Sequence, residues 1–94
     1  MTKSEHDGNG KKNLYFFAAV AKNGRTAVED SENAVRREVK EWGVTKNNIA
    51  VFECYFNGTN TKKELTHRRR FPLRPRHYRA LENACVIYLE NRRY

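Results

Sequence analysis

The sequence lacks any apolar run long enough to form a membrane-spanning helix. Such a helix needs about 18–20 consecutive apolar residues, whereas the longest apolar run here covers only residues 14–21. The first residues also lack the apolar stretch of a secretory signal. These absences exclude membrane and export classes, and we predict a cytoplasmic protein with no membrane partner.

Cysteine is scarce, with only two residues in the chain, Cys54 and Cys85. Each lies among apolar neighbours, the first in a segment with strand periodicity and the second in one with helical periodicity. Two cysteines without an export signal are typical of reduced thiols in a core. Because neither belongs to a Cys-x-x-Cys pair, the sequence offers no zinc site.

Motifs for cofactor binding and catalysis are also missing. None of the five glycines forms a phosphate-binding loop; they lie in the polar N-terminal segment or at expected turns. The paired acidic residues lie at a helix cap or on a helix surface. We therefore predict no cofactor, no metal and no catalytic residues, which favours a binding protein over an enzyme.

The pattern that is present predicts two strands and then a helix. Residues 14–21 are apolar at both parities, which is typical of a central strand. Asn23-Gly24 is a strong hairpin signal, so residues 25–29 are the expected returning strand. Val35, Val39 and Trp42 then recur at helical spacing, after a possible cap at Asp30 or Ser31 and before a stop at Gly43.

The second half of the chain repeats this order. Residues 49–56 read as another strand, and residues 61 to about 70 as a basic edge strand. Pro75 suits the first residue of a final helix, in which Tyr78, Leu81, Cys85, Tyr88 and Leu89 keep helical spacing.

The order ββαββα predicts an α+β fold with a four-stranded, mostly antiparallel sheet and two helices packed on one face. We expect one domain over residues 14–94, after a flexible tail at residues 1–13.

Positive charge is concentrated in one segment. Residues 62–79 contain eight Lys or Arg and one Glu, a net +7 of the formal +8 of the chain. A localised Arg field indicates an anionic partner, and guanidinium groups suit bidentate contacts with phosphate or carboxylate. The candidate binding residues are Lys62, Lys63, His67, Arg68, Arg69, Arg70, Phe71, Arg74, Arg76, His77 and Arg79.

These residues favour a small, non-enzymatic protein that binds nucleic acid, RNA or DNA, or a nucleoprotein complex through phosphates. Phe71 and Tyr94 are the aromatic residues expected to be exposed beside arginine, where they would stack on bases.

Two alternatives stay open. The small size, lopsided charge and lack of catalytic motifs resemble phage or mobile-element inhibitors of the anti-CRISPR kind, which implies docking on a host protein–RNA machine. The combination of His67, His77, Tyr78 and arginines resembles, in composition only, small bacterial ribonuclease toxins of the RelE type. In that case His would move protons and Arg would stabilise the transition-state charge without a metal.

Overall fold

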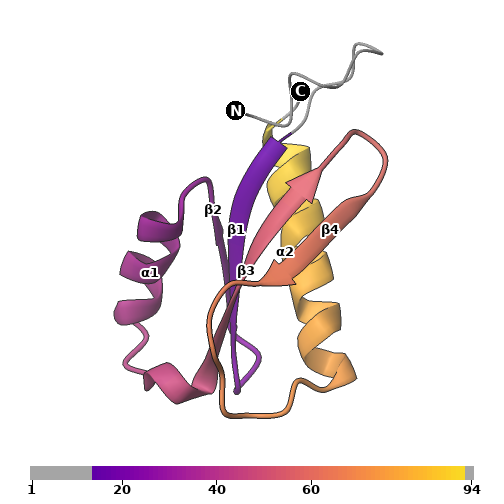
Figure 1. Cartoon of the computed structure of the whole chain (residues 1–94). Coiled ribbons are helices and arrows are strands. Elements are labelled where there is room, and N and C mark those ends of the chain that lie inside the picture. Colours follow the sequence, from indigo (N-terminus) through magenta and orange to yellow (C-terminus); the bar gives the residue numbers. More distant parts are fainter. Residues whose placement is uncertain (1–13, 93–94) are drawn as a thin grey trace.

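The computed structural model describes residues 14–92 and shows an α+β fold with the order β–β–α–β–β–α (Figure 1). A short 3₁₀ turn, η2, precedes the third strand. The elements are β1 (Leu14–Ala21), β2 (Thr26–Glu29), α1 (Glu32–Lys40), η2 (Lys46–Asn48), β3 (Ile49–Phe56), β4 (Thr61–Leu65) and α2 (Pro75–Arg92). The predicted fold class and element order are confirmed. The predicted tail at residues 1–13 lies outside the described residues.

The four strands form one antiparallel sheet in the order β2-β1-β3-β4. β1 is central, as its sequence predicted, with Ala18 opposite both Val28 and Phe52. Its last four residues, 18–21, are fully buried at both parities. Both faces of this strand are therefore covered.

The two helices lie on opposite faces of the sheet, so the prediction that both pack on one face is wrong. Phe16, Ala18 and Val20 of β1 share a core with α2, whereas Ala19 and Ala21 share another with α1. Successive side chains of a strand point to opposite faces. Because β1 is apolar on both faces, one helix is needed on each, and Figure 1 shows the sheet between them.

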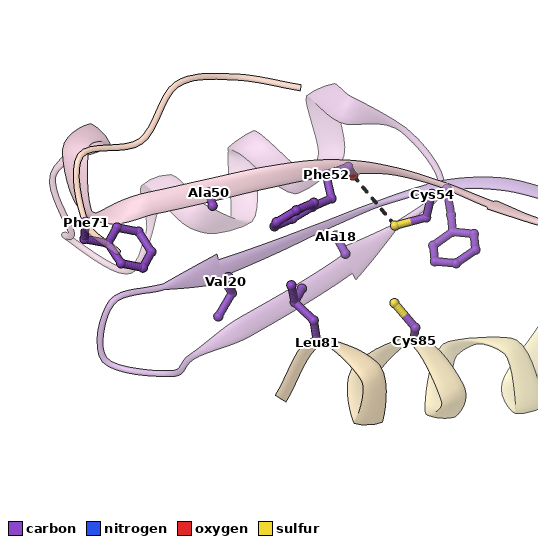
Figure 2. Packing of buried hydrophobic residues seen from close by; sticks show 9 residues of the cluster. Ala18, Val20, Ala50, Phe52, Cys54, Phe71, Leu81 and Cys85 are labelled. Carbon is purple, nitrogen blue, oxygen red and sulfur yellow. Dashed lines mark hydrogen bonds between the residues drawn. The ribbon is translucent and has the colours of Figure 1, made fainter. Parts of the chain in front are cut away.

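The face covered by α2 carries the larger core. Leu81 and Cys85 point from α2 toward Phe52 and Cys54 of β3 (Figure 2). Both cysteines are buried and free, as the sequence predicted. A hydrogen bond to Cys85, together with burial, raises the pKa of Cys54, so this thiol stays protonated.

Helix α1 begins at the second of the two predicted caps. The Ser31 hydroxyl accepts a hydrogen bond from the Ala34 amide at 3.2 Å, which satisfies one amide of the first turn. Val35 and Val39 are its buried residues. Gly43 follows with a φ of 72°, the left-handed conformation expected of the predicted stop.

The fourth strand is shorter than predicted. β4 ends at Leu65, and the amide and the hydroxyl of Thr66 both donate to the Val51 carbonyl, at 2.8 and 3.0 Å. The chain then leaves the strand conformation, so the prediction of a strand to about residue 70 is wrong. This departure takes Phe71 into the core beneath α2.

Helix α2 begins at Pro75, as predicted. Leu81 and Cys85 face the sheet, but Tyr78 is 46% exposed, so the assignment of Tyr78 to the apolar stripe is wrong. No helix within the described residues combines the length and the apolarity needed to cross a membrane.

Candidate anion-binding surface

The predicted basic segment divides into two separate groups. Lys62 and Lys63 lie on β4 opposite Tyr55 and Cys54, whereas His67 contacts Ile49 at the other end of β3. Tyr55 lies six positions after Ile49 on β3, which is about 20 Å along a strand. The two lysines therefore do not share a surface with the arginines that follow His67.

The arginines gather at one end of the molecule, where the β1–β2 turn, η2 and the start of α2 meet (Figure 1). The Arg70 amide donates to the Asn47 carbonyl at 3.1 Å, and the Arg76 Nη2 donates to the Lys22 carbonyl at 3.1 Å. We call this surface the arginine end. Its members are Arg68, Arg69, Arg70, Arg74 and Arg76, and Arg79 lies one helical turn farther along α2.

Residues 66–70 are held alongside β3 and η2 although they are not a strand. The Thr66 amide, the His67 Nε2 and the Arg70 amide bond in turn to carbonyls of residues 51, 49 and 47. Arg68 and Arg70 are exposed on either side of half-buried Arg69. The Arg69 Nε is buried and has no hydrogen-bond partner in the described part of the chain. These hydrogen bonds thus fix the backbone positions from which the side chains of Arg68, Arg69 and Arg70 extend.

His77 is a structural residue and not a surface ligand. Its side chain is 1% exposed. Its Nδ1 accepts from the Arg74 amide at 2.9 Å, and its Nε2–H donates to the Lys22 carbonyl at 2.9 Å. Both ring nitrogens are therefore engaged inside the protein, which removes His77 from the candidate binding residues. Because His77 is buried, it is not accessible to transfer protons to RNA, as the ribonuclease hypothesis requires.

Phe71 is buried as well, at 3% exposure, so its predicted exposure is wrong. Its ring packs edge-on against His77 with the centroids 5.3 Å apart and the planes at 69°. This aromatic side chain belongs to the core that α2 shares with the sheet, beneath the arginine end. Tyr94, the other predicted stacking residue, lies outside the described residues.

The guanidinium groups of the arginine end are not neutralised by carboxylates within residues 14–92. The ion pairs found there are Arg36–Glu32 at 2.6 Å, Lys63–Glu82 at 2.7 Å and Arg92–Asp30 at 3.9 Å. Lys63 is thus paired and largely covered, which separates it further from the candidate surface. The first turn of α2 adds partial positive charge beside Arg74 and Arg76.

His67 is half-buried, and its ring is fixed by the hydrogen bond from Nε2–H to the Ile49 carbonyl at 2.9 Å. Burial and the nearby Arg36 lower the pKa of His67, so the imidazole is neutral near pH 7. Its Nδ1 is buried without a partner among the described residues. The neutral ring of His67 therefore adds no positive charge to the candidate surface.

The structure adds two exposed lysines that sequence reasoning missed. Lys22 belongs to the β1–β2 turn and Lys46 to η2, and both turns bond to the arginine end. Only the antiparallel topology brings them there, because they lie 40 and 16 residues before the start of the basic segment in the sequence. No local signal in the sequence identifies them.

Comparison with known proteins supplies no function. No family model matches the sequence, and searches of curated proteins and of solved structures found no similar protein. Within residues 14–92, no group of three or more His, Cys, Asp or Glu side chains is placed to hold a metal ion. Function must therefore be argued from the arginine end itself.

Proposed function

We propose that the protein is a non-enzymatic binding protein whose arginine end contacts the phosphate backbone of a nucleic acid, free or within a nucleoprotein complex. One observation carries this proposal. Five arginines from a fixed loop and from the start of α2 lie at one end of the fold, and none has a carboxylate partner within residues 14–92.

The chemistry of the surface suits the repeated phosphates of a nucleic-acid backbone rather than a single small anion. Guanidinium groups bind phosphate oxygens in a bidentate manner, and Lys22 and Lys46 extend the charge across the two neighbouring turns. Contacts of this kind set the position of a protein on a nucleic acid without reading its sequence. We therefore expect binding with little base specificity.

Fluorescence anisotropy with labelled RNA and DNA oligonucleotides over a salt series tests the proposal. Five phosphate contacts give a slope of log K against log salt of about −4.5 on duplex DNA, and a shallower one on single strands. The variant Arg68→Glu/Arg70→Glu changes two exposed residues and should lower the affinity at least tenfold.

The matched control is Lys62→Glu/Arg92→Glu, which changes the net charge by the same amount. Lys62 lies on β4, and Arg92 lies in the last turn of α2, so both are distant from the arginine end. This variant should keep most of the affinity. An equal loss in the two variants would mean that net charge alone governs binding and would contradict the proposal.

A pull-down with and without nuclease treatment separates free nucleic acid from a nucleoprotein target. Recovery of nucleic acid by the isolated protein supports direct binding. Capture of a host protein–RNA complex, without binding to free oligonucleotides, would instead favour the inhibitor resembling the anti-CRISPR kind.

A further inference from the structure

A groove opens beside the arginine end on the α1 face of the sheet. α1 packs chiefly over β1 and β2, and its Val35 and Val39 share a core with Ile49 and Val51 at the start of β3. The space between α1 and the start of β3 has a volume of about 560 Å³. This volume falls within the range of about 300–1,000 Å³ that is usual for ligand sites.

The rim of the groove is cationic. Arg36, Arg37, Lys40 and Lys46 line it, and none of the described residues that line it is acidic. Arg36 is paired with Glu32, whereas the other three have no ion pair within residues 14–92. Arg36, Arg37 and Lys40 belong to the charged surface of α1. The fold turns that surface toward a cavity that favours an anion.

The floor of the groove is apolar. Val39, Val44, Ile49 and Val51 line it. Val44 is half-buried and is the accessible part of this floor, whereas the other three are buried in the core that α1 shares with the sheet. Phosphate gains nothing from such a floor, whereas the flat face of an aromatic ring gains burial there. The rim and floor together fit a ligand with a negatively charged group and an apolar ring, which are the two parts of a nucleotide.

The groove is continuous with the arginine end through two residues. His67 lines the groove and directly precedes Arg68. Lys46 also lines it, and the carbonyl of the next residue, Asn47, accepts a hydrogen bond from the Arg70 amide. The ring of His67 is held in place by its bond to Ile49. A polyanion lying across the arginine end would therefore pass the mouth of the groove.

We propose that the groove takes an unpaired base of a single-stranded nucleic acid, with the flanking phosphates on Arg37, Lys40 and Lys46 and the strand continuing onto the arginine end. This inference rests on the proposed function and narrows its partner from any nucleic acid to a single strand. A base within a duplex enters such a groove only after unpairing and unstacking, which costs free energy. Stacking on a protein surface, in contrast, accepts any base because every base has a flat face.

Three probes of equal length test this inference by anisotropy: a single-stranded oligonucleotide, its duplex, and a strand whose bases are replaced by abasic sites. All three carry a phosphate backbone, but only the first offers unpaired bases. The wild-type protein should bind the intact single strand about tenfold more tightly than the abasic strand or the duplex. A free mononucleotide should bind far more weakly, because it reaches only the groove.

Two variants separate the floor from the rim. Val44→Asn removes apolar floor without changing charge and should abolish the preference for the intact strand over the abasic one. Lys40→Gln should lower the affinity for the intact and the abasic strand by a similar factor. The control is Ile87→Asn, which changes a 57% exposed apolar side chain on α2 and should leave all affinities unchanged. Circular dichroism checks the fold of each variant.

The outcomes distinguish the two proposals. Equal affinity of the wild type for the intact and abasic strands, with the effect of Arg68→Glu/Arg70→Glu preserved, overturns the groove and leaves the arginine end standing. Tight binding of the mononucleotide alone would make the groove a small-molecule site and overturn the single-strand inference. Absence of binding to every probe removes both.

Discussion

The two faces of the sheet differ in how completely they are covered. On the α2 face, an 18-residue helix and the segment around Phe71 bury the side chains of β1 and β3. On the α1 face, a 9-residue helix covers one side of the sheet and leaves a groove over β3. The closed face provides most of the apolar burial, and the open face provides accessible chemistry. Stability thus rests mainly on one face of the small sheet, whereas the groove that we propose as a binding site lies on the other.

Core truncations on the two faces should differ most in their effect. Leu81 is fully buried on the closed face, and Val39 is 8% exposed on the open face. Leu81→Ala should lower the free energy of unfolding by about 3 kcal/mol, since it leaves a cavity in a packed core. Val39→Ala removes less apolar volume, at the floor of the groove, and should cost about 1.5 kcal/mol. Urea unfolding measures both, and equal losses would erase the distinction between the faces.

The polar anchor on the closed face should come next. His77→Ala removes the side chain that accepts from the Arg74 amide and one of the two donors to the Lys22 carbonyl, which keeps its bond from Arg76. The variant should cost about 2 kcal/mol because a partly buried amide loses its hydrogen-bond partner. The neighbouring variant Tyr78→Ala, at an exposed position, should stay within about 0.5 kcal/mol of the wild type. Thermal unfolding compares the two. A Tyr78→Ala loss as large as that of His77→Ala would argue against the anchor.

The smallest effect is a pH dependence from the open face. Burial lowers the folded-state pKa of His67, with Arg36 and Lys46 adding to this and Glu32 opposing it. The unfolded chain then binds the proton more readily, so stability should fall as the pH drops below about 6.5, the ordinary His pKa. His67→Gln, whose amide can still donate to the Ile49 carbonyl, should flatten this part of the stability curve between pH 5.5 and 7. An unchanged curve would rule out His67 as the source.

The sequence contains a signal for the placement of the two helices that our prediction of the fold did not use. Residues 14–21 are apolar at both parities, and this pattern alone requires cover on both faces of β1. The prediction of two helices on one face overlooked that requirement. Strand limits for residues 14–21 and 49–56 and the helix start at Pro75 were correct because alternation and proline are local signals.

The candidate site was less predictable because its members meet only in three dimensions. The arginines could be named from sequence, but their separation from Lys62 depends on where β4 ends. An aromatic residue between Arg70 and Pro72 looks exposed, and its burial is decided by a core assembled from distant strands. Lys22, Lys46 and the groove beside α1 follow from topology alone.

The Lys22 carbonyl has a consequence for how the chain assembles. It accepts hydrogen bonds from Arg76 and His77, which lie 54 and 55 residues later. The β1–β2 hairpin is a local structure, and its tip is held by η2, through the Lys22 amide and the Asn48 carbonyl at 2.8 Å, as well as by α2. The contacts with α2 join distant parts of the sequence, and such contacts slow folding. Until α2 docks, the apolar face of β1 that it covers stays exposed to water. A nascent chain halted before residue 75 would therefore be prone to aggregate.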